Sequence, residues 1–229
     1  MTILDDLRGG LVISCQPLPD EPDDPMRDPY VQARVAAAAV RGGAVAIRAN
    51  GLADIAAIRA TVDVPVIGLV KAGSDGVFIT PTATHAVDAA LAGAHIVAVD
   101  ATDRPRPDGR SFADTVQAVR ECSRALVLAD ISTEQEAVAA VEAGADAVAT
   151  TLSGYTPDSP ATDGPDLDLL ARLTKLLSVP VIAEGRYRDT EQIGEAFAAG
   201  AHAVVMGNAV TSPLWITRRL VPATPRATG

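Results

Sequence analysis

The segment AGAHIVAVD, residues 92–100, recurs in close variants as AGADAVATT (143–151) and AGAHAVVMG (199–207). A fourth segment, GGAVAIRAN (42–50), has the same pattern. Each segment begins with a Gly-containing turn, which follows an Ala-rich helical pattern. A continuous apolar run comes after the turn. Such a run predicts a strand that is buried on both faces, as in a parallel sheet covered by helices.

Further apolar runs complete a set of eight predicted strands, at residues 11–15, 43–48, 65–70, 95–100, 125–130, 146–150, 180–183 and 203–206. Helical patterns separate them throughout, so we expect the strands to be parallel. This alternation predicts an α/β fold, a (β/α)8 TIM barrel formed by residues 1–229 as a single domain. The main rival is an open doubly wound sheet. That fold would carry a GxGxxG turn after the first strand, where SCQPLPDEPDDP (14–25) stands instead.

The composition argues against several classes of protein. The net charge is −10 and there is no Lys/Arg cluster, so a nucleic-acid partner is not expected. The two cysteines, Cys15 and Cys122, lie far apart and form no metal-binding pattern. No run approaches the roughly 18 apolar residues of a membrane span, and the N-terminus lacks an apolar signal core. We therefore expect a cytoplasmic protein with no membrane partner and a disordered tail at 222–229.

Polar and charged residues stand at the ends of the apolar runs. The carboxyl ends of parallel strands meet at one mouth of a closed barrel, where the long loops also gather. We therefore expect these side chains to converge there. In strand order they are Gln16, Arg48, Lys71, Asp100, Asp130, Thr150 with Thr151, Glu184 and Gly207.

Two of these residues suggest acid/base chemistry. Lys71 is one of only two lysines in a chain with seventeen arginines, and it follows the third predicted strand. Glu184 follows the seventh, which lies opposite the third in an eight-membered ring. Lys can act as a general base when its pKa is lowered, whereas Arg stays protonated, so the pair suits proton removal and return at one carbon. We expect burial and Arg48 to lower the Lys71 pKa.

Structural roles compete with these functional ones. Lys71 could simply pair with Asp100 or Asp130, and Glu184 with Arg48 or Arg186. Asp130 could cap the helix that follows it.

We expect the ligand of this barrel to carry a phosphate group. Barrels of this kind commonly bind it with the loops after strands 7 and 8, where Gly185 and Gly207 leave the backbone accessible. The three histidines, His85, His95 and His202, fall in a helix or before strands and are expected to be structural. No spacing of His, Asp or Glu suggests a metal site.

The motifs resemble those of one family, the bacterial N-acetylmannosamine-6-phosphate 2-epimerases, over nearly the whole chain. The matching segments include GLVISCQ (10–16), GGAVAIRANG (42–51), VPVIGLVK (64–71), VFITPT (77–82), LADIST (128–133), TTLSGYT (150–156), PVIAEGR (180–186) and AVVMGNAVTSP (203–213).

The resemblance implies a barrel of the ribulose-phosphate-binding type that interconverts N-acetylmannosamine 6-phosphate and N-acetylglucosamine 6-phosphate in amino-sugar or sialic acid catabolism. It implies a homodimer and no organic cofactor. Lys71 and Glu184 match the catalytic pair, and Glu184 would act either at C2 or in ring opening. The implied substrate-binding residues are Gln16, Arg48, Asp130 and Arg186, to which Thr151 is added from its place at a strand end. The phosphate loops match Gly185, Gly207 and Asn208.

Two other functions remain open from sequence. A pentulose-phosphate 3-epimerase would need paired Asp and His ligands around a metal, and the strand ends lack them. A phospho-sugar sensor without turnover is a different class. The segment AGSDG (72–76), shorter here than the family's loop after the lysine, would suit it, whereas the retained Lys71 argues against it.

Overall fold

The computed structural model describes residues 2–73 and 76–225. Across these residues eight parallel strands form a closed barrel in chain order, and β1 pairs with β8 to complete the ring. The prediction of a (β/α)8 barrel is therefore confirmed and the open sheet is excluded. The strands are β1 (Leu11–Cys15), β2 (Ala46–Asn50), β3 (Val66–Leu69), β4 (Ile96–Asp100), β5 (Leu126–Asp130), β6 (Ala147–Ala149), β7 (Val181–Glu184) and β8 (Ala203–Met206).

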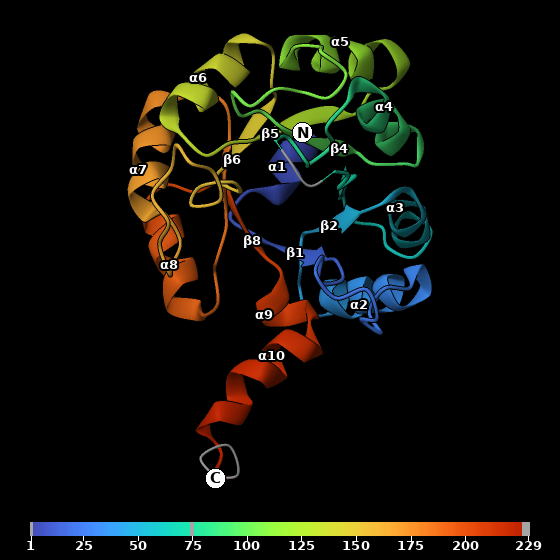
Figure 1. The fold of residues 1–229 in the computed structure, drawn as a ribbon, viewed down its shortest axis with the longest axis vertical. Coiled ribbons are helices and arrows are strands. Elements are labelled where there is room, and N and C mark those ends of the chain that lie inside the picture. The colour runs from blue at the N-terminus through green and yellow to red at the C-terminus, as the bar shows by residue number, and fades with distance from the viewer. Residues whose placement is uncertain (1, 74–75, 226–229) are drawn as a thin grey trace.

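Helices surround the barrel, as the ribbon shows (Figure 1). Several begin at side-chain caps that the sequence carries. Thr133 and Ser111, for example, cap their helices in reciprocal capping boxes with Glu136 and Asp114. The helices are α1 (Ile3–Leu7), α2 (Pro29–Arg41), α3 (Leu52–Arg59), α4 (Ala83–Leu91), α5 (Phe112–Cys122), α6 (Glu134–Glu142), α7 (Leu167–Leu176), α8 (Thr190–Ala198), α9 (Asn208–Thr211) and α10 (Pro213–Leu220).

The core has two layers because strand side chains alternate between the two faces of the sheet. Residues such as Ile67, Ile96 and Leu128 fill the barrel interior, together with Leu7 of α1. Residues of opposite parity, such as Val97, pack outward against the helices. Helix α1, which the sequence did not predict, lies beneath the barrel, where the Leu4 carbonyl contacts His202 Nε2 at 2.6 Å.

The C-terminal helix α10 projects away from the barrel and has no buried residue among those described (Figure 1). It is followed by a short 3-10 helix, η1 (Val221–Ala223). Of the segment 222–229, expected to be a disordered tail, residues 226–229 lie outside the described residues, as do residues 74 and 75 of the segment 72–76.

Candidate functional site

The inward-facing positions of the barrel change from apolar to polar toward the carboxyl ends of the strands. On β2, Ala46 belongs to the interior cluster while Ile47 and Ala49 face outward, so Arg48 points inward. The same alternation directs the side chains of Asp130 and Glu184 into the barrel. A polar layer therefore closes the top of the apolar core.

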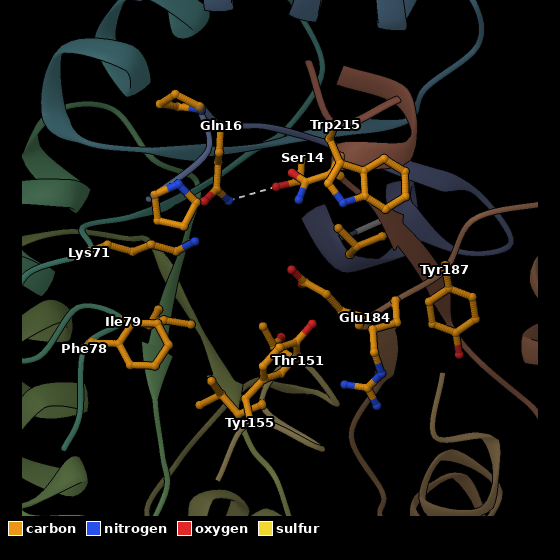
Figure 2. Close-up of a pocket in the computed structure, with 18 of the residues that line it drawn as sticks. Ser14, Gln16, Lys71, Phe78, Ile79, Thr151, Tyr155, Glu184, Tyr187 and Trp215 are labelled. Carbon is orange, nitrogen blue, oxygen red and sulfur yellow. Dashed lines mark hydrogen bonds between the residues drawn. The ribbon is translucent and has the colours of Figure 1, made fainter. Parts of the chain in front are cut away.

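A cavity of about 460 Å³ opens above this layer (Figure 2). Eight of the residues that the sequence singled out line it: Gln16, Lys71, Thr151, Glu184, Gly185, Arg186, Gly207 and Asn208. The predicted convergence of strand ends at one mouth of the barrel is therefore observed for these residues.

Lys71 lies two residues beyond the end of β3, with its side chain open to the cavity. Its N–H donates to Asn50 Oδ1 at 2.8 Å, and its backbone forms an antiparallel bridge with Ile79. Within the described part of the chain, no ion pair joins Lys71 to Asp100 or Asp130. Desolvation, followed by the positive charge of Arg48, lowers the pKa of the Lys71 ammonium, in the direction expected from sequence.

Glu184 ends β7 on the opposite side of the ring, and its side chain points toward the side of the cavity that holds Lys71 (Figure 2). Its carboxyl is 13% exposed, and Oε2 lies 3.0 Å from Arg48 Nη1. The predicted alternative pairing of Glu184 with Arg48 is thus present, and the carboxyl still reaches the cavity. Desolvation raises its pKa to about 7, although Arg48 acts in the opposite direction.

Arg48 and Asp130, expected to bind substrate, lie beneath the cavity and do not line it. Their side chains are 1% and 0% exposed, and the guanidinium binds the carboxylate through two bonds of 3.2 and 2.6 Å. Arg48 was placed at a strand end because β2 was predicted at 43–48. The strand runs to Asn50, so Arg48 sits two residues below its end.

Asp130 is also not a helix cap, since Thr133 is the N-cap of α6. Its second partner is Thr151, which lines the cavity and whose Oγ1 donates to Asp130 Oδ1 at 2.6 Å. The Asp130 carboxylate therefore links a buried arginine to a cavity residue.

Arg186 is held by the loop between β6 and α7 and not by Glu184. Its guanidinium donates to the Gly164 and Ser153 carbonyls at 2.7 and 2.6 Å and to Thr162 Oγ1 at 3.0 Å, and it stacks on the Tyr155 ring. These acceptors are uncharged. Arg186 therefore brings a positive charge to the cavity wall that, among the described residues, no carboxylate pairs.

The three expected phosphate residues line the same cavity as Arg186. Gly185 has φ of +115°, a conformation that favours glycine, and it follows β7 directly. Gly207 follows β8 and precedes Asn208, the first residue of α9. Arg188, exposed at the same rim, adds a second guanidinium.

The cavity residues that the sequence argument missed include Ser14, Phe78, Tyr155 and Trp215. Ser14 could have been found from alternation along β1. The single tryptophan, Trp215, gives no such signal, because it comes after the last strand and only the placement of α10 brings it to the cavity. Arg104 and Asp100 form an ion pair at 2.7 Å beside Phe78 and also lie outside the cavity lining.

The described residues provide neither a cluster of metal ligands nor a membrane-spanning helix. No group of three His, Cys, Asp or Glu side chains there is placed to hold a metal ion. No helix in the same residues is long and apolar enough to cross a membrane.

Comparison with known proteins decides the family. The family model NanE, described as "Putative N-acetylmannosamine-6-phosphate epimerase", matches residues 32–226. The chain belongs to this epimerase family. Relatives of the same designation from Cutibacterium acnes and Caldanaerobacter subterraneus subsp. tengcongensis are each 46% identical to it. The alignments cover 94% and 96% of this chain and 93% of each relative.

Solved structures agree with this family assignment. The structure of the N-acetylmannosamine-6-phosphate 2-epimerase from Clostridium perfringens superposes with a TM-score of 0.92 at 38% identity, covering 98% of this chain and 97% of that one. A thiamine phosphate pyrophosphorylase from Pyrococcus furiosus, 17% identical with a TM-score of 0.63 over 95% of this chain and 93% of its own, shares the fold alone.

Proposed function

We propose that this chain interconverts N-acetylmannosamine 6-phosphate and N-acetylglucosamine 6-phosphate by moving the proton at C2. Membership of the epimerase family supports the substrate. The observation that carries the chemistry is the placement of Lys71 and Glu184 on opposed strands at one cavity, with shifted pKa values of opposite direction.

The reaction begins with an open sugar chain, because C2–H becomes acidic only when C1 is an aldehyde. In one direction the neutral Lys71 amine takes the C2 proton, the electron pair of the C–H bond forms the C1–C2 double bond, and the carbonyl π electrons move onto the C1 oxygen to give an enolate. Protonated Glu184 then delivers a proton to the other face of C2, and the aldehyde re-forms. The reverse direction exchanges the two roles.

The environment of the pair suits this exchange. A general acid and base work best when their pKa values lie near the operating pH. Desolvation moves both groups that way, lowering the pKa of Lys71 and raising that of Glu184 to about 7. We therefore assign Glu184 to C2 and not to ring opening alone.

The phosphate is proposed to lie against Gly185, Gly207 and Asn208, close to Arg186 and Arg188. Gln16 and Thr151 are left to contact the sugar, because both line the cavity and neither belongs to the phosphate loops. Arg48 and Asp130 are proposed to act through Glu184 and Thr151, since they are buried beneath them.

We propose that residues 1–229 form one domain that acts in the cytoplasm as a homodimer, with no cofactor. Helix α10 supports the dimer, because it extends from the barrel and Leu220 remains 64% exposed. Sedimentation of the wild type and Leu220→Asp tests this: dimer for the first and monomer for the second supports α10 as the interface, and unchanged dimers contradict it.

The experiment for the function is proton NMR of the protein with N-acetylmannosamine 6-phosphate in deuterated water. Growth of N-acetylglucosamine 6-phosphate carrying deuterium at C2 supports the proposal. Transfer of the original proton to the product points to one base, Lys71, and removes Glu184 from C2. Binding without exchange or conversion favours the sensor.

A further inference from the structure

The strands β3 and β4 separate just below Lys71. Their register pairs only Ile67 with Ile96 and Gly68 with Val97. Above this level, the backbone groups of Val70 on one side and of Ala98 and Asp100 on the other bond to a third segment. That segment is residues 79 and 80, which return from the loop after β3 and fill the gap.

Thr80 is the centre of this wedge. Its N–H donates to the Val70 carbonyl at 2.7 Å, and its hydroxyl accepts from the Val70 N–H at 3.2 Å. The same hydroxyl donates to the Ala98 carbonyl of β4 at 2.6 Å. One side chain thus bonds both separated strands.

Its backbone conformation is unusual. Thr80 has φ of +48°, in the left-handed region that β-branched residues rarely adopt, and its side chain is fully buried. Such a conformation persists only where the surroundings fix it. The bonds of the hydroxyl, and that of the Thr80 carbonyl to Arg106 Nη2 at 2.8 Å, provide this constraint.

The wedge leads directly to Lys71. Ile79 forms the antiparallel bridge with Lys71, and the Ala72 N–H donates to the Phe78 carbonyl at 3.0 Å. Ile79 is also tied to β4, because its carbonyl accepts from the Asp100 N–H at 2.9 Å. The backbone of Lys71 is therefore held in place through residues 78–80.

We propose that Thr80 is a positioning residue for Lys71: its hydroxyl locks residues 78–80 between β3 and β4, and this directs the lysine amine across the cavity to Glu184. The inference rests on the proposed function for its catalytic consequence. The structural part stands separately, because it concerns where the amine lies.

The chain offers a direct way to observe this amine. Lys71 and Lys175 are its only lysines, and Lys175 lies exposed on α7. In protein labelled with 15N-lysine, the pH dependence of the Lys71 Nζ signal reports its surroundings, and Lys175 is an internal reference. The charged groups that influence Lys71 are Arg48, Glu184, Asp130 and Asp20.

The test compares Thr80→Val, which keeps the shape and loses the hydroxyl, with Thr80→Ser, which keeps the hydroxyl. For the valine variant we expect kcat to fall about tenfold or more, KM to stay within about threefold, and the Lys71 pKa to rise as water reaches the loosened loop. The serine variant should keep most of the wild-type kcat and a Lys71 pKa close to that of the wild type. The matched control is Thr174→Val, which loses a 2.7 Å bond to the Ala199 carbonyl far from the cavity and should change neither.

A folded Thr80→Val protein with an unchanged Lys71 titration and kcat would overturn the proposal, as would equal defects in the valine and serine variants. If the valine variant does not fold, Arg106→Met carries the test, because it removes the bond to the Thr80 carbonyl. A shifted Lys71 signal supports the proposal and an unshifted one contradicts it. If the wild type does not convert the sugar phosphate, the proposed function fails, and the lysine titration still decides the role of Thr80.

Discussion

Arg48 Nη1 lies 3.0 Å from Glu184 Oε2, while the same guanidinium binds both oxygens of Asp130. One buried cation therefore serves two carboxylates, and the three groups together carry one negative charge when both acids are ionised. Protonation of Glu184 removes that charge at the side that faces the cavity. This explains how a carboxyl beside an arginine keeps a raised pKa, since desolvation and Asp130 together outweigh Arg48.

The first prediction concerns stability against pH. The pKa of Glu184 rises from 4.5 to about 7 on folding, so between these values the folded state keeps a proton that the unfolded chain has lost. The free energy of unfolding then falls as pH rises through this window and shows no further loss above it. Glu184→Gln cannot lose a proton. Relative to the wild type it should gain about 2 kcal/mol between pH 4.5 and pH 7.5, on the scale of 1.36 kcal/mol per pKa unit.

Urea unfolding of both proteins across this pH range measures the difference. A constant difference between variant and wild type would show that the Glu184 carboxyl has the same pKa in both states. Asp114→Asn is a suitable control, because hydrogen bonds from Ser111 lower the Asp114 pKa below its usual value of 3.8, so its stability difference from the wild type should stay constant between pH 4.5 and pH 7.5.

The second prediction concerns Arg48 itself. Arg48→Gln leaves two carboxylates buried without their cation, and such a change costs about 3–5 kcal/mol. Arg172→Gln breaks the ion pair with Glu134 at 3.1 Å, whose side chains are 56% and 38% exposed, and should cost less than about 1 kcal/mol. Chemical denaturation of the two variants gives the comparison. Equal costs would mean that the buried cluster is not held by Arg48.

Much of this arrangement could be predicted from sequence, because its cause is local. A strand buried on both faces shows as an unbroken apolar run, so the strands were placed to within a few residues. The residues at the ends of these runs include Lys71 and Glu184. A closed ring of eight strands then places these two residues on opposite sides of the barrel mouth.

What could not be predicted depends on contacts between distant segments. The limits of β2 are set by its bonds to β1 and β3. The strand ends two residues later than predicted, so Arg48 lies in the layer beneath the cavity and does not line it. The left-handed Thr80 reflects the gap between β3 and β4, which no local pattern records. Trp215 reaches the cavity because of where α10 lies.

The third prediction separates charge from basicity at position 71. Lys71→Arg keeps a cation but cannot supply a neutral amine, so kcat should fall by about a thousandfold or more while affinity for the sugar phosphate changes less than about tenfold. Lys175→Arg is the matched control and should have wild-type turnover. Turnover by Lys71→Arg at the wild-type rate would remove Lys71 from the reaction.

The last prediction tests the phosphate loops. N-acetylmannosamine without its phosphate should bind at least about 100-fold more weakly than the 6-phosphate, a difference of about 2.7 kcal/mol.

Gly207→Ala adds a methyl group whose nearest neighbour is Ser14 Cβ at 3.5 Å, an ordinary contact, so the chain itself has room for it. The methyl group would cover backbone that faces the cavity. It should therefore weaken binding of the phosphorylated sugar and leave the weak binding of the free sugar unchanged. Gly194→Ala, on α8 and with no atom within 4 Å of the added carbon, is the control. Titration calorimetry of the wild type and the two variants with both sugars gives six affinities, and equal weakening of the binding of both sugars by Gly207→Ala would place the phosphate elsewhere in the cavity.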